Sequence, residues 1–97
     1  TTYRLPYQTI LYFTLERRKV HCVTTERTVS FYGKLDAVAA EVGKHFVRIH
    51  QRYLVRIGAI AHMETDEVVL VNGERLPLSR SQRQTALLAV AQQTLEG

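Results

Sequence analysis

The sequence has few of the residues that mark several familiar protein classes: it contains one cysteine, two prolines and no tryptophan in 97 residues. A single cysteine, Cys22, cannot form a disulfide within the chain. This excludes a disulfide-stapled secreted domain and is typical of a reducing compartment. Cys22 lies among strand-forming residues, where a small buried thiol is more typical than a redox sensor. No apolar run approaches the roughly 20 residues that cross a bilayer, so we expect a soluble, cytoplasmic protein with no membrane partner.

Residues suited to covalent or metal chemistry are present, but they lack the spacing that such sites require. The four histidines and Cys22 do not form a zinc-ligand pattern. Ser79 and Ser81 have no nucleophile-elbow context, and the glycines do not compose a phosphate-binding loop. We therefore expect no catalytic residues, no metal and no cofactor, and the chain is not predicted to be an enzyme.

The length is sufficient for one modest hydrophobic core and too short for two, so residues 1–97 are expected to form a single domain. The sequence begins TTYRLPY, without an initiator methionine and without the pattern of a secretory signal. This start indicates a chain cut from a longer protein, with a further domain upstream.

Positive charge is concentrated in three places. The formal net charge is +4, and the basic residues are ten arginines and three lysines. Residues 42–63 contain no acid but hold one lysine, three arginines and three histidines, and smaller basic groups occur at 17–19 and around Arg80 and Arg83. Arginine favours planar, bidentate contacts with phosphate or guanine. The groups are either solvated faces or parts of one surface that binds a polyanion.

Hydrophobic patterning predicts a mainly β fold with a short internal helix and a C-terminal helix. A helical period over residues 35–42, followed by Gly43, predicts the internal helix, and a second helix is expected from Ser81 onward. Asn72-Gly73 predicts a type I′ hairpin turn, and Pro77 predicts an edge strand. Strands are expected at 10–13, 20–23, 28–31, 46–49, 60–63 and 67–71.

The segment FVRIHQRYLVRI, residues 46–57, allows two interpretations. As one helix, it would align Arg48, Arg52 and Arg56 in a basic stripe suited to a major groove. Its β-branched and aromatic residues instead favour a strand, a break at Gln51-Arg52 and a second short extended segment. We prefer the broken version. In both versions Arg48 lies on a polar face.

The combination FVRIH-x-x-YLV, NG-x-x-LP-x-SR and the upstream ILYF and VHCVT runs resembles the LytTR DNA-binding domain over about residues 5–88. The resemblance implies elongated, mostly antiparallel β-sheets whose loops enter successive major grooves at promoter direct repeats. It also implies transcription regulation as the effector part of a bacterial two-component response regulator, downstream of a receiver domain that these 97 residues do not contain. Such a domain is expected to be a monomer in isolation and paired on double-stranded DNA.

Carried onto this sequence, the resemblance implicates three loops. Within Glu16 to Lys19 the base-reading position falls on or beside Arg18, and in the third loop two adjacent basic residues are common in the family. This chain has Arg80-Ser81 there, so either Arg80 or Arg83 could read a base. Arg48 is expected either to contact a phosphate or to pair with an acid on a neighbouring strand. The expected DNA-binding residues are Arg17, Arg18, Lys19, Arg48, His50, Gln51, Arg52, Arg80, Ser81 and Arg83.

A different class of function stays open on the sequence alone. A basic β domain could bind RNA, single-stranded DNA or an acidic protein partner. Binding to single strands usually requires aromatic side chains beside the positive groups, on which bases stack. Most aromatic residues near the basic groups are expected to face the core instead, which favours duplex DNA.

Overall fold

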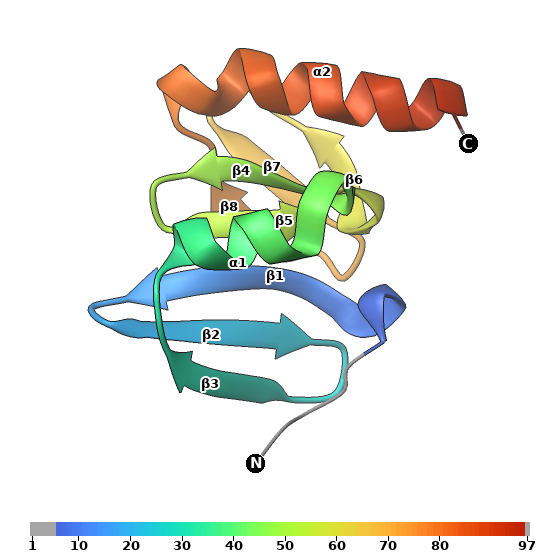
Figure 1. Cartoon of the computed structure of the whole chain (residues 1–97). Helices are drawn as coiled ribbons and strands as arrows, with labels where there is room; N and C mark the ends of the chain where they lie inside the picture. Colours follow the sequence, from blue (N-terminus) through green and yellow to red (C-terminus); the bar gives the residue numbers. More distant parts are fainter. Residues whose placement is uncertain (1–5, 97) are drawn as a thin grey trace.

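The computed structural model describes residues 6–96, which form two β-sheets and two α-helices (Figure 1). The helices are α1 (Leu35–Val42) and α2 (Arg80–Glu96). Short 3₁₀ turns at Tyr7–Thr9, Gly43–His45 and Ile57–Ala59 precede β1, β4 and β6. The strands are β1 (Ile10–Glu16), β2 (Lys19–Thr24), β3 (Thr28–Tyr32), β4 (Phe46–His50), β5 (Tyr53–Arg56), β6 (Ile60–Met63), β7 (Glu67–Leu70) and β8 (Arg75–Pro77).

The strands form a five-stranded sheet of order β3-β2-β1-β5-β4 and a three-stranded sheet of order β6-β7-β8. Every pair of neighbouring strands is antiparallel. The molecule measures 37 × 27 × 25 Å along its principal axes. The fold class predicted from the sequence, antiparallel sheets with an internal and a C-terminal helix, is confirmed.

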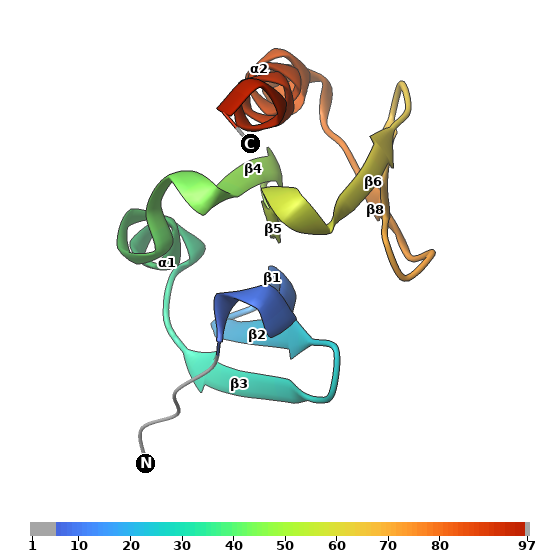
Figure 2. The same ribbon diagram turned by 90° about the vertical axis from the view of Figure 1, so that its right-hand side faces the viewer.

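The larger sheet is covered on both faces at its centre. One face packs against α1 through a cluster that includes Phe13, Leu35 and Leu54. The other face packs against the smaller sheet and α2 through a cluster that includes Val55, Leu70 and Ala86. Figure 2 shows the smaller sheet standing to one side of β4 and β5, with α2 above them. Double coverage explains why the central strands read as continuous apolar runs rather than as alternating patterns.

The broken interpretation of residues 46–57 is confirmed, and the single-helix alternative is wrong. Phe46–His50 and Tyr53–Arg56 pair as antiparallel strands, joined by a two-residue turn at Gln51 and Arg52. Val47, Ile49, Leu54 and Val55 are buried, so branched side chains fill the core on both sides of the turn. Burial of these β-forming residues decides the conformation in favour of strands.

The turn at Asn72-Gly73 differs from its prediction. A type I′ turn needs positive φ at both residues, but of the two only Gly73 has it, at 90°. The Gly73 amide donates to the Leu70 carbonyl at 2.9 Å, and the Leu70 amide donates to the Glu74 carbonyl at 2.8 Å. The loop therefore has three residues and ends in a left-handed glycine. The Asn72 side chain favours this form because its Oδ1 accepts the Glu74 amide at 2.9 Å.

Other boundaries follow the sequence closely. The internal helix ends at Gly43, whose φ of 70° continues no helix and whose amide donates to the Ala39 carbonyl. Pro77 lies in β8, an edge strand, as predicted. Cys22 is buried, and burial raises the pKa of its thiol to about 11, so it is a core residue with little thiolate.

A part-buried hydrogen bond between side chains joins the two sheets. The Tyr12 hydroxyl of β1 donates to Glu74 Oε2 at 2.7 Å, next to the β7–β8 loop. Tyr12 is only 7% exposed. Burial, and then the bond to the Glu74 carboxylate, raise the pKa of Tyr12 well above its ordinary value. The neutral hydroxyl is therefore part of the folded state.

We expect Tyr12→Phe to lower the free energy of unfolding by about 1–2 kcal/mol, because it removes a hydrogen bond to a charged acceptor. Since the pKa of folded Tyr12 lies above that of unfolded tyrosine, about 10, wild-type stability from this group is complete below pH 10 and lost as the pH rises beyond it. Tyr12→Phe should remove that alkaline loss. Urea unfolding followed by circular dichroism between pH 7 and 11 measures both effects.

Tyr32→Phe is the matched control, because Tyr32 is 76% exposed and packs little of its side chain into the core. Its effect should stay within about 0.5 kcal/mol. Equal losses for the two substitutions would show that the inter-sheet bond contributes nothing specific.

Candidate nucleic-acid interface

Three loops that carry the expected DNA-binding residues lie at one end of the molecule. They are the β1–β2 loop, the β4–β5 loop and the start of α2, which Figure 1 shows one above another along its left side. In Figure 2, viewed along the perpendicular direction, β1, β5, β4 and α2 again lie in one column. The chain therefore presents these loops as a single row.

The β1–β2 loop holds its two arginines in a tight turn. Glu16 and Lys19 pair across the hairpin, so Arg17 and Arg18 form a two-residue loop. Arg17 has a φ of 60°, and among residues 6–96 no other residue except glycine has positive φ. Positive φ at the first loop residue alone is the pattern of a type II′ turn, which favours glycine there. The Lys19 ammonium lies 5.3 Å from the ring centroid of Tyr32, so the hairpin end rests on β3.

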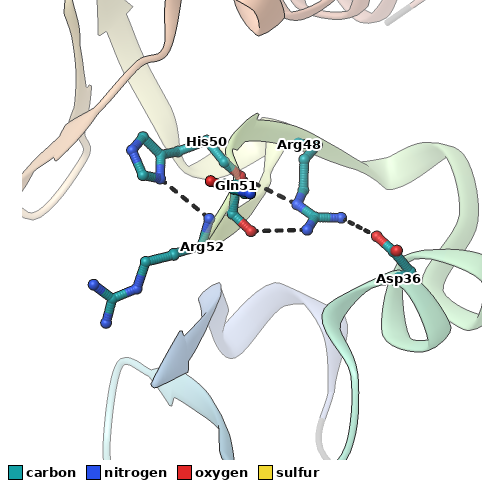
Figure 3. Close-up of polar contacts among 5 residues, drawn as sticks. All are labelled: Asp36, Arg48, His50, Gln51 and Arg52. Atoms are coloured by element: carbon teal, nitrogen blue, oxygen red, sulfur yellow. Dashed lines mark hydrogen bonds and ion pairs between the residues drawn. The ribbon is translucent and has the colours of Figure 1, made fainter. Parts of the chain in front are cut away.

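The β4–β5 loop is held by contacts of its own residues. The Arg52 amide donates to Nδ1 of His50 at 3.1 Å (Figure 3). An acceptor role for Nδ1 leaves the ring proton of neutral His50 on Nε2, which can then donate to an external oxygen. The Gln51 and Arg52 side chains are exposed at the tip. This loop therefore offers the Gln51 carboxamide, the Arg52 guanidinium group and the Nε2 proton of His50 to a ligand.

The start of α2 is fastened to β4. The Ser79 amide donates to the Ile49 carbonyl at 2.8 Å, and the Gln82 amide donates to the Ser79 carbonyl at 3.1 Å. The Ser79 and Ser81 hydroxyls lie 3.4 Å apart. Arg80 and Arg83 are exposed in the first turn of the helix. Two arginines and two hydroxyl groups thus lie near the amide end of a helix, which favours anionic partners.

Backbone hydrogen bonds connect the three loops through the β4–β5 loop. The Leu15 amide, at the end of β1, donates to the Arg52 carbonyl at 2.9 Å. In return, Nε of Arg52 donates to the Leu15 carbonyl at 2.9 Å. The Ser79–Ile49 bond makes the corresponding connection to α2. Each outer loop is therefore tied within a few residues of its tip to the central one.

The three arginines of FVRIHQRYLVRI all bind carbonyl oxygens of the chain itself. Arg48 donates to the carbonyls of His50 and Gln51, Arg52 to that of Leu15, and Arg56 to those of Gln8 and Ile10. Gly58 leaves room for Arg56, because a Cβ there would lie 2.6 Å from Arg56 Nη1. The periodically spaced arginines therefore hold the backbone in place through hydrogen bonds, a role that their spacing in the sequence did not indicate.

The charged residues of the row differ in whether an acid neutralises them. Among the side chains described, no carboxylate lies within 4 Å of Arg17, Arg18, Arg80 or Arg83. Arg48 instead forms an ion pair with Asp36 of α1, with 2.6 Å between Nη1 and Oδ1. The acid that was expected on a neighbouring strand is therefore on a helix. Unpaired arginines at the loop tips leave a positive surface.

Two surface hollows run beside the loops. A hollow of about 550 Å³ is lined in part by Arg17, Arg18 and Tyr32, and one of about 510 Å³ is lined by His50, Gln51, Ser79, Ser81 and Gln82. Asp36 and Arg48 line both. The Asp36–Arg48 pair therefore lies between the first loop and the other two.

The family model described as the LytTr DNA-binding domain matches residues 1–89. The chain belongs to the LytTr family. As a LytTr domain it is a DNA-binding domain that acts in the regulation of transcription. A search among curated proteins finds no match.

A solved structure supports the same fold for this LytTr domain. The chain is similar to a LytTr DNA-binding domain from Bacillus cereus, which is described as part of a methyl-accepting/DNA response regulator. The TM-score is 0.82 at 22% sequence identity, over 89% of this chain and 84% of that one.

Neither a metal-binding cluster nor a membrane-spanning helix is found in the part of the LytTr domain that the structure describes. Between residues 6 and 96, no group of three or more histidine, cysteine or acidic side chains could hold a metal ion. Neither helix in that range is long and apolar enough to cross a membrane.

The strain at Arg17 generates a stability prediction. Arg17→Gly should raise the free energy of unfolding by up to about 1 kcal/mol, because glycine adopts positive φ without the cost of a Cβ. Thermal and urea unfolding measure the change. Arg17→Ala, which removes the same charge and keeps the strain, should not stabilise the LytTr domain. Arg18→Gly should destabilise it by about 0.5–1 kcal/mol, because Arg18 has no positive φ to relieve. A gain from Arg17→Ala as large as that from Arg17→Gly would attribute the effect to charge.

Proposed function

We propose that this LytTr domain binds double-stranded DNA sequence-specifically at promoter direct repeats, as the effector part of a two-component response regulator. Its three loops enter neighbouring parts of the major groove along one face of the duplex. The receiver domain lies upstream in the full-length, cytoplasmic protein. The domain alone is a monomer, and two copies lie side by side on the DNA.

The observation that carries this proposal is the row of loops with unpaired cations at their tips. A duplex carries phosphates at regular intervals, so a rigid row of positive loops matches it better than a flexible one. The ties from Leu15 to Arg52 and from Ile49 to Ser79 keep the loops in a fixed relation. Loops held in this way lose little conformational entropy on binding.

Within the row, three residues are assigned to bases and the others to the backbone. Arg18 suits the O6 and N7 atoms of guanine, Gln51 suits the N6 and N7 atoms of adenine, and Arg80 suits guanine in the third loop. Lys19, His50 and Arg52 lie beside them and donate to phosphates. Arg17, Ser81 and Arg83 complete the phosphate contacts of the two outer loops.

One observation favours single strands as a second candidate. Most aromatic residues near the basic groups were expected to face the core, but Tyr32, beside the first loop, is 76% exposed. An exposed ring next to arginines can stack on a base. Tyr12 and Phe13 are buried and Tyr53 is partly buried, however, so these three aromatic side chains offer little surface on which bases could stack.

Selection of duplexes from a random pool, followed by gel shift, tests the function directly. The selected sequences should contain two similar half-sites in direct orientation, and the selected duplex should bind far more tightly than a scrambled duplex, a single strand or RNA. Binding should weaken steeply with salt, with a slope in log K of roughly −0.9 for each phosphate contacted. Equal affinity for all four ligands would contradict the proposal.

Arg18→Ala should reduce affinity for the selected duplex by about 1–3 kcal/mol and relax the preference at one base position, because it removes a bidentate contact. Fluorescence anisotropy with single-base variants of the duplex measures both quantities. Arg27→Ala removes the same charge at the opposite end of the β2 strand, in the β2–β3 loop. This control should change affinity little and leave base preference intact.

If Arg18→Ala weakens binding to every sequence alike, Arg18 contacts a phosphate and does not read a base. The same comparison for Arg80→Ala and Arg83→Ala decides which arginine of the third loop reads a base.

A further inference from the structure

The guanidinium group of Arg48 could bind a phosphate, but in the structure it donates hydrogen bonds to other residues of the chain. Its Nε donates to the His50 carbonyl at 3.1 Å, its Nη2 to the Gln51 carbonyl at 2.8 Å and its Nη1 to Asp36 Oδ1 at 2.6 Å (Figure 3). All three nitrogens of the guanidinium group therefore have partners in the chain. The Arg48 side chain is 24% exposed, so much of it is removed from solvent.

Those partners define the conformation of the central loop. The His50 carbonyl lies immediately before the two-residue turn of Gln51 and Arg52, and the Gln51 carbonyl lies within that turn. A planar guanidinium group that binds both carbonyls fixes the orientation of the two peptide units to which these carbonyls belong. The direction of the Gln51 side chain follows from that orientation.

The negative charge of Asp36 is unexpected on a surface that faces DNA, unless the carboxylate is there to hold Arg48. Its side chain is 87% exposed and lies beside the hollows that also contain Arg18 and Gln51. A carboxylate there repels phosphates and lowers affinity. An ion pair this exposed contributes little to stability, about 0–1 kcal/mol. Among the described residues, its hydrogen bond and ion pair are with Arg48, and this contact completes the alignment of the guanidinium plane.

We propose that Asp36 and Arg48 are positioning residues for DNA recognition: Asp36 aligns Arg48, and Arg48 holds the β4–β5 loop in the conformation that reads the duplex. The proposal rests on the proposed function, because it gives the central loop its role at the DNA. It follows that an acid next to the binding surface strengthens specific binding, contrary to its charge.

Asp36→Asn is the decisive substitution, and Glu41→Gln is its matched control. Both residues lie in α1, both are exposed, and both changes remove one negative charge. Charge alone predicts slightly tighter binding to DNA for each. The positioning role predicts that Asp36→Asn weakens binding to the selected duplex about fivefold to tenfold, the loss of roughly one charge-assisted hydrogen bond. Binding of scrambled duplex should not weaken.

Arg48→Lys separates positioning from phosphate contact. Lysine keeps the charge but cannot bind two carbonyls and a carboxylate in one plane. A phosphate contact would survive this change almost intact, with the same affinity and the same salt slope. The positioning role predicts a loss similar to that of Asp36→Asn. The double variant should lose little more than either single one, because the two residues act as a unit.

A measurement without DNA keeps the test independent of the proposed function. In ¹⁵N NMR of the free domain, Asp36→Asn and Arg48→Lys should shift the amide signals of Gln51 and Arg52 and increase their mobility, while Glu41→Gln should leave them unchanged. Thermal unfolding should show that all variants stay folded. Unchanged loop signals would overturn the proposal whether or not the wild type binds duplex DNA.

Two DNA results would also overturn it. One is tighter binding of the selected duplex by Asp36→Asn, equal to that of Glu41→Gln. The other is wild-type affinity for Arg48→Lys. Failure of the proposed function has a different signature, since the wild type itself would then not distinguish the selected duplex from scrambled DNA.

Discussion

The arrangement of the three loops depends on one set of hydrogen bonds, which holds the β4–β5 loop between its neighbours. The Arg52 backbone and side chain bind Leu15, and the Ile49 carbonyl binds the amide of Ser79. These bonds join two sheet strands and a helix that lie far apart in the sequence. A row of loops held by hydrogen bonds results, and loops fixed in this way lose little conformational entropy on binding a ligand.

The arginines of residues 46–57 and those of the two outer loops differ in how their hydrogen-bonding groups are used. Arg48, Arg52 and Arg56 donate to backbone carbonyls, so part or all of their hydrogen-bonding capacity is used inside the molecule. Among the side chains that the structure describes, no carboxylate lies within 4 Å of Arg18 or Arg80. A count of basic residues therefore overstates the number of guanidinium donors that are left after the contacts within the molecule are made.

Local signals predicted most of the elements because they act over a few residues. Gly43 ended the helix as expected, and the β-branched residues of 46–57 gave strands. The turn at Asn72-Gly73 was predicted with the wrong geometry, because its dipeptide allows several turns and the side-chain bond of Asn72 to Glu74 selected one. The partner of Arg48 was also misplaced, since spacing along the chain does not reveal that α1 crosses beside β4.

The sequence by itself determined the β-rich class, the two helices, the family and the loops on which its charges are concentrated, because propensity, periodicity and motif spacing are written in neighbouring residues. Only the tertiary structure decided that Arg48, Arg52 and Arg56 bind backbone carbonyls, and that an acid, Asp36, lies beside the row of loops and pairs with Arg48. Such pairings arise when packing brings distant segments within 3 Å of each other, and no local pattern encodes that proximity.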